Sequence, residues 1–254
     1  MDFTLATEQF LTVMLGAVRT GAWMMLCPPF NSKLIPAQVK ALLSVGLTLP
    51  MMPYMKSGPI SFETKDLIFN VLMQAFVGAS LGFLTLMLFA SVQAAGDLLD
   101  LFGGFTLAAT YDPFSQSSAS IFGRFYNLVA LTLLFASDGH QMILRGFLQS
   151  FRTLPLDASF DLETLSKLLL RGVGEFFMAA VQIAGPLIAV LFLADVALGL
   201  LNRVAPALNA FQLGFPIKIF LLATLAGIAI GLLPGALDTI VEKAVNVVIQ
   251  LSGG

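Results

Sequence analysis

Residues 67–92 contain no charged side chain, and this segment constrains the fold more than any other feature of the chain. As a helix it would be about 39 Å long at about 1.5 Å per residue, whereas the hydrocarbon core of a bilayer is about 30 Å thick. The segment is therefore long enough to cross a membrane and must tilt or protrude. Its small residues Ala75, Gly78, Ala79 and Gly82 share one helical face, and we expect Gly78 and Gly82 to permit close packing against another helix.

The bulk composition agrees with a membrane protein. Hydrophobic residues make up 57% of the 254 residues and charged residues only 11%, with a formal net charge of −2. A soluble domain carries about 25% charged residues. This balance excludes a cytosolic enzyme, a disordered chain and a nucleic-acid binder that relies on a basic surface. We therefore predict an all-α, hydrophobic, multi-helix protein associated with membrane lipid.

The remaining apolar runs are less regular. They are residues 10–28, 41–55, 125–136, 176–194 and 211–233. The second of these contains Pro50 and Pro53, which predicts a kinked or incomplete span, and the third is too short to span a bilayer alone. Length alone allows about six spans of about 20 residues each. Residues 141–175 predict a helix, a turn and an amphipathic helix, and the tail after Pro234 predicts another amphipathic helix.

The sequence offers little for catalysis. His140 is the one histidine and Cys27 the one cysteine, so neither a nucleophile with its base nor a Cys- or His-based metal site can be assembled. The G-x-S-x-G, H-E-x-x-H and phosphate-loop motifs do not occur. We expect no catalytic residues, no metal and no cofactor.

Charges in apolar surroundings are the informative polar residues, because an ionisable group at membrane depth is costly and normally faces a partner or a watery cavity. These residues are Arg19, Asp97, Asp100, Asp195, Arg203 and Lys218. Asp97 and Asp100 are three residues apart, hence on one helical face, where they could meet a basic group. Such charges serve either an ion or proton path or ion pairs that fix helices within a complex. The second interpretation is favoured, because the acids lie at the ends of the spans.

Residues 93–124 form the largest break in the hydrophobic pattern, and residues 103–114 within it combine backbone freedom with aromatic bulk. Gly103 and Gly104 allow irregular backbone conformations, and Phe105, Tyr111 and Phe114 supply aromatic bulk. A loop this apolar cannot lie in lipid with open backbone groups, so protein must enclose it or it must line a pore. The residues alone leave a pore-obstructing loop and a buried core loop equally open.

An ordered set of motifs along the whole chain resembles one family. The set comprises AGDLLD at residues 95–100, Asp112-Pro113, Gly139-His140, Ser150-Phe151, Pro155, Ala194-Asp195, and RVAPALNAFQLGFPIK at residues 203–218. Together they resemble the FliR family of flagellar biosynthesis proteins, which belongs to the export apparatus of type III secretion systems. The family often has an acid near the start of the long apolar segment, where this chain has Gln74. That departure is compatible with a structural role at this position.

The resemblance implies a subunit of the flagellar export gate in the bacterial inner membrane, within the flagellar basal body. One copy would assemble with several copies of FliP and FliQ into a helical hetero-oligomeric complex that binds FlhB and passes unfolded polypeptides. The chain would join a FliP-like part, residues 1–175, to a FliQ-like part, residues 176–254. Kinked and broken helical hairpins, lifted out of the bilayer plane, would replace six regular spans.

The resemblance also implies a pore plug in the loop already singled out. The residues assigned to it are Gly103, Gly104, Phe105, Leu107, Tyr111, Asp112, Pro113 and Phe114. Asp195, Arg203 and Lys218 would then serve assembly. The alternative function is a small secondary transporter that uses an intramembrane carboxylate as its ion-coupling site, and it would predict inverted-repeat halves.

Overall fold

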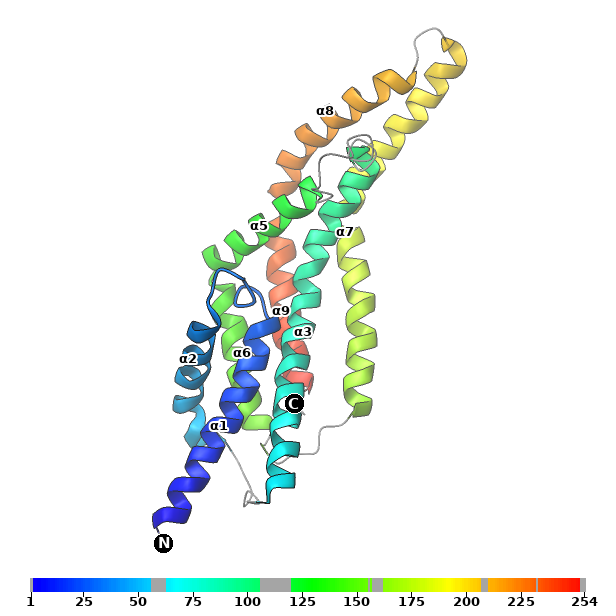
Figure 1. Cartoon of the computed structure of the whole chain (residues 1–254). Coiled ribbons are helices and arrows are strands. Elements are labelled where there is room, and N and C mark those ends of the chain that lie inside the picture. The colour runs from blue at the N-terminus through cyan, green and yellow to red at the C-terminus, as the bar shows by residue number, and fades with distance from the viewer. Residues whose placement is uncertain are drawn as a thin grey trace. The chain divides into compact units, whose positions relative to one another are not determined.

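The computed structural model describes residues 2–55, 63–105, 120–154, 156, 162–206, 210–231 and 233–251. Within these ranges every regular element is a helix (Figure 1), which confirms the all-α prediction. The elements are α1 (Asp2–Leu26), α2 (Ala37–Thr48), the 3-10 helix η1 (Leu49–Tyr54), α3 (Thr64–Gly103), α5 (Ile121–Ala136), α6 (Gly139–Thr153), α7 (Leu162–Val204), α8 (Ala210–Ile230) and α9 (Leu233–Leu251).

The chain divides into two compact units. The first comprises Met1–Met87, Ser137–Val173 and Ile240–Gly254, and the second comprises Leu88–Ala136 and Gly174–Thr239. The expected division into residues 1–175 and 176–254 concerns resemblance to other subunits rather than contacts within the chain, and it stays a prediction.

In the first unit, α1 and α2 form an antiparallel hairpin (Figure 1). The hydroxyl groups of Thr20 and Thr48 are hydrogen-bonded at 3.0 Å, and the Ser44 hydroxyl lies 3.6 Å from the Met24 sulfur. The α-helical geometry of α2 ends at Thr48, where η1 begins with Pro50 in its first turn. The predicted kink in residues 41–55 is therefore present, because proline cannot donate to the preceding turn.

The long helix α3 lies against α1 at two glycines. A side chain on Gly78 would overlap the backbone carbonyl of Arg19, and one on Gly82 would come within 2.8 Å of the Trp23 carbonyl oxygen. Trp23 in turn stacks on Phe147 of α6, with ring centroids 4.2 Å apart. Backbone-to-backbone approach at Gly78 and Gly82 thus sets the spacing of α1 and α3.

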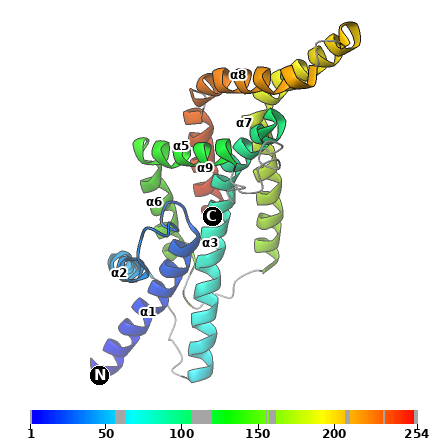
Figure 2. The same ribbon diagram turned by 45° about the horizontal axis from the view of Figure 1, so that its top comes forward.

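The second unit contains two further antiparallel hairpins. The C-terminal part of α3 runs beside α5, where Asn127 donates to Gln93 at 3.2 Å and a side chain on Gly96 would overlap the Phe122 carbonyl. Helices α7 and α8 form the other hairpin (Figure 2), in which Leu198 faces Gly214. Pro186 in α7 and Pro216 in α8 lie inside their helices. The helical hairpin agrees with the fold that the resemblance implied, while α7 and α8 continue through their prolines.

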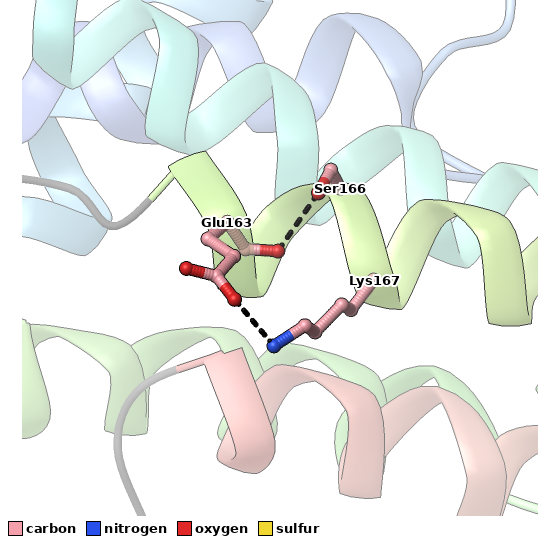
Figure 3. Close-up of polar contacts among 3 residues, drawn as sticks. All are labelled: Glu163, Ser166 and Lys167. Carbon is pink, nitrogen blue, oxygen red and sulfur yellow. Dashed lines mark hydrogen bonds and ion pairs between the residues drawn. The ribbon is translucent and has the colours of Figure 1, made fainter.

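Helix α7 corrects one prediction. The expected amphipathic helix before residue 175 and the apolar run from Phe176 onward are a single helix, Leu162–Val204. Its first turns are stabilised by local polar contacts, in which Lys167 pairs with Glu163 at 2.6 Å and Ser166 donates to the Glu163 carbonyl at 2.8 Å (Figure 3). A change from polar to apolar side chains does not end a helix, because only the backbone hydrogen bonds must continue.

The count of about six full spans is also corrected. Within the described residues, two helical stretches are long and apolar enough to cross a membrane, Thr64–Gly103 and Ser166–Val204. The stretches Ile121–Ala136 and Leu213–Gly227 are apolar but shorter. The predicted amphipathic tail is present as α9, in which Leu237, Ile240, Val241 and Ala244 are buried.

Candidate functional site

Asp100 brings together the two ends of the glycine-containing loop. Its side chain is buried on α3, and its Oδ2 accepts hydrogen bonds from the Ser120 hydroxyl and from the Phe122 backbone N–H, the latter at 3.0 Å. Ser120 precedes α5 and accepts from the Gly123 N–H at 2.7 Å, as a helix N-cap does. The end of α3 and the start of α5 are therefore joined directly by one carboxylate.

Asp97 and Asp100 were considered as partners of a basic group in this chain or in a complex, and that pairing stays a prediction. Within the described residues neither carboxylate has a cationic partner. Asp100 instead satisfies unpaired N–H and O–H donors at the start of α5. Asp97 is exposed, and its Oδ1 lies beside Gly123, where a side chain would overlap it. Asp100 Oδ1 is buried without a hydrogen-bond partner in the described part of the chain.

The loop leaves α3 at two glycines that contact α8. Gly103 ends the helix, and Gly104 has a φ of 85°, a left-handed conformation that favours glycine. A side chain on Gly103 would come within 2.8 Å of Leu222, and one on Gly104 within 2.9 Å of Phe215. Phe105 then packs edge-on against Phe122, with ring centroids 5.6 Å apart.

Lys218 connects this point to α7. Its Nζ lies 2.6 Å from Asp195 Oδ1 and also donates to the Phe102 carbonyl at 3.4 Å. The Lys218 side chain is 17% exposed and that of Asp195 is 47% exposed. The structure thus joins two of the predicted charged residues, whereas Arg203 is exposed in the last turn of α7.

Arg19 is a separate polar centre in the first unit. It is fully buried, and its Nε donates to Gln74 Oε1 at 2.6 Å. Its Nη1 donates to the carbonyls of Leu154 at 3.1 Å and Ser150 at 3.4 Å, which belong to the C-terminal end of α6. A cation is stabilised there because the helix dipole and the unpaired carbonyls are negative. Arg19 therefore joins α1, α3 and α6 through neutral acceptors.

The predicted roles of the site residues stay predictions. Of the loop residues assigned to a plug, Leu107, Tyr111, Asp112, Pro113 and Phe114 lie outside the described residues. Within the part of the chain that the structure describes, no cluster of three or more His, Cys, Asp or Glu residues could hold a metal ion.

Several residues of these contacts were missed from the sequence. Ser120 was available as a signal, because a serine directly before an apolar run is a typical N-cap. Gln74 was identified from the sequence as standing where the family often has an acid, and the structure adds that it accepts from Arg19. Phe215 and Leu222 carry no such signal, since an aromatic or aliphatic residue in an apolar helix is unremarkable in sequence. The structure shows that Phe215 and Leu222 lie beside Gly104 and Gly103, on the same face of α8 as Lys218.

These features define an all-α membrane protein in which buried polar groups join helices. The model of the family described as bacterial export proteins, family 1, matches residues 10–244. Flagellar biosynthetic protein FliR of Pectobacterium carotovorum subsp. carotovorum is 32% identical over 217 residues, covering 85% of this chain and 83% of that protein. The FliR proteins of Bacillus subtilis strain 168 and Escherichia coli K12 are 28% and 29% identical, covering 84% and 80% of this chain and 83% and 77% of their own lengths. The chain belongs to bacterial export proteins, family 1.

Proposed function

We propose that this chain is a non-enzymatic subunit of the flagellar type III secretion export gate. In this proposal it forms, with FliP and FliQ, a channel for unfolded flagellar proteins in the inner membrane at the flagellar basal body, and it contacts FlhB. The family match over residues 10–244 carries the proposal and supports a role in the flagellar export apparatus.

The exposed apolar surface of the second unit supports assembly with apolar partners. Phe177, Phe192, Leu193 and Phe220 are between 59% and 70% exposed on α7 and α8. Large apolar side chains exposed on these two helices gain free energy when protein or lipid covers them. We propose that FliP-like and FliQ-like parts of the chain, residues 1–175 and 176–254, take equivalent places beside those subunits.

Residues 103–118 are the proposed pore plug. The contacts of Asp100, Gly103 and Gly104 support this role, because they fix both ends of a loop that begins with two glycines and carries Phe105, Leu107, Tyr111 and Phe114. An apolar constriction can close a pore to ions by excluding water, without a charged barrier. Displacement of the plug would then admit an exported polypeptide.

Deletion of residues 104–117 tests the plug. Membranes that contain the assembled complex with the deletion should leak K⁺ faster than membranes with the same amount of unaltered complex, because the apolar barrier is gone. The amount of assembled complex is measured in the same membranes, so a leak is compared per complex. An unchanged leak at equal complex content would contradict the plug.

The secondary transporter is the alternative. It needs an acid that exchanges an ion or proton, whereas Asp195 is paired with Lys218 and Asp100 accepts two hydrogen bonds. Both contacts favour a structural role for these carboxylates. Binding of a small solute by the isolated chain would favour the transporter.

A further inference from the structure

We propose that α2 and the turn before it bind an anionic phospholipid. In this site the outer face of α2 contacts the acyl chains, and Lys33 and Lys40 hold the phosphate of the headgroup. The outer face consists of Val39, Leu42, Leu43 and Val45 of α2 and Leu49 of η1, which are between 42% and 74% exposed. The site lies within the first unit and goes beyond the proposed export gate, since it does not depend on FliP or FliQ.

The polarity of α2 is the reverse of that of a helix in a soluble protein. Its buried residues are Ser44 and Thr48, which face Met24 and Thr20 of α1. Both hydroxyls also donate to the carbonyls four residues earlier in α2, at 2.7 Å in each case. Figures 1 and 2 show α2 at the edge of the first unit. Polar and small residues between helices, with apolar side chains outward, are the arrangement that lipid favours.

The length of the apolar surface matches the hydrocarbon core of a bilayer. Helix α2 has 12 residues and η1 has 6, which correspond to about 18 Å and about 12 Å. Leu49, where they meet, keeps helical dihedral angles (φ −53°, ψ −51°), so the segment is continuous over about 30 Å, the thickness of the core. No charged residue lies between Lys40 and the end of η1, where Arg152 covers the ring of Tyr54 at 4.3 Å from its centroid. Charges therefore lie near the two ends of the segment.

Lys33 and Lys40 make one end of this segment positive. Lys33 is exposed in the turn before α2, and the side chain of Lys40 leans back toward the same end, because helical side chains point toward the helix N-terminus. The sequence has no acidic residue between Glu8 and Glu63, and within the described residues neither lysine pairs with a carboxylate. A zwitterionic headgroup carries its own cation beside the phosphate. The two lysines therefore favour a headgroup with a net negative charge.

A tryptophan on the outer face reports contact with acyl chains. Leu42→Trp is made in the full chain and reconstituted in vesicles of phosphatidylcholine with brominated acyl chains, which quench tryptophan on contact. Trp23, the one native tryptophan, is fully buried and gives the same background in every variant. The matched control is Gln149→Trp, at an exposed position of α6 on the same face as Arg145 and Arg152.

We expect stronger quenching of Leu42→Trp than of Gln149→Trp. Quenching of Leu42→Trp that does not exceed that of the control would show that protein, rather than lipid, covers the outer face, and it would overturn the proposal. A second copy of the chain as that occupant would be detected as a dimer in size-exclusion chromatography.

Competition between lipids tests the lysines. At low ionic strength, unbrominated phosphatidylglycerol should relieve the quenching of Leu42→Trp about thirtyfold more effectively than unbrominated phosphatidylcholine, at about fivefold for each lysine. Lys33→Gln with Lys40→Gln should abolish this preference, whereas Lys33→Arg with Lys40→Arg should retain it. A preference that the glutamine pair leaves unchanged would overturn the proposal.

Two controls separate a lipid site from general attraction of anions. Lys65→Gln with Lys167→Gln removes the same charge from exposed positions at the starts of α3 and α7 and should leave the preference unchanged. An equal loss in this pair would overturn the proposal. Soluble glycerol phosphate has the headgroup chemistry without acyl chains and should not displace phosphatidylglycerol. Displacement by glycerol phosphate would indicate a site for a soluble anion and would also overturn the proposal.

Discussion

Gly78→Ala tests the close approach of α1 and α3. The added methyl group would overlap the backbone carbonyl of Arg19, which cannot rotate away as a side chain can. Alanine favours the helix by about 1 kcal/mol relative to glycine, and overpacking costs about 1–3 kcal/mol in a well-packed contact. Because the obstacle is backbone, the overpacking cost lies at the upper end of this range. The net loss of folding stability is therefore about 2 kcal/mol. The melting temperature should fall by about 4–8 °C for a chain of this size.

The single cysteine supplies the assay. Cys27 is buried in the first unit, directly after α1, and a thiol-reactive fluorescent dye reports when heating exposes it. Gly185→Ala is the matched control, because the same substitution inside α7 would meet no atom within 4 Å. We expect Gly185→Ala to melt at or above the temperature of the unaltered chain in detergent. A melting temperature for Gly78→Ala equal to that of Gly185→Ala would refute the steric argument.

Four further substitutions test the polar contacts. Asp100→Ala removes the acceptor of the Phe122 N–H and should destabilise the start of α5 by about 2 kcal/mol, measured as faster amide hydrogen exchange there; unchanged protection would contradict the cap. Arg19→Met should lower the dye-reported melting temperature, because Gln74 Oε1 and two carbonyls lose their donor, and Gln74→Leu, which also removes the Nε2 donor to the Leu156 carbonyl, should cost less stability in the Arg19→Met background than in the unaltered chain. Additive effects of the two changes would argue against their coupling. Asp195→Ala should lower the yield of assembled complex more than export per complex, whereas normal yield with lost export would instead indicate a proton path.

The sequence predicted the helical fold and its interruptions because their causes are local. Proline lacks an N–H, so the break after Thr48 follows from Pro50 and its neighbours. The small-residue face of α3 predicted a close helix contact. It did not indicate that α1 is the partner, since the sequence carries no information on which helix lies opposite.

The misjudged features depend on backbone groups that a sequence pattern does not display. The sequence raised a basic group as one possible partner of Asp100, whereas the structure shows the Phe122 N–H as a partner, a donor that every residue except proline carries. The boundary near Phe176 was expected because polarity changes there, whereas α7 continues because its backbone hydrogen bonds do. Lys218 was identified by its charge, but its contact with the end of α3 required the structure.

Purification of the chain after co-expression with FliP and FliQ tests whether it is a subunit of the export gate. With an affinity tag on this chain alone, we expect both other proteins to elute with it as one particle of constant composition in size-exclusion chromatography. The exposed apolar residues of α7 and α8 would be covered in that particle, and Phe177 or Phe220 should then be protected from labelling. Elution of the chain alone, as a monodisperse monomer or homodimer that binds a small solute, would contradict the export-gate account.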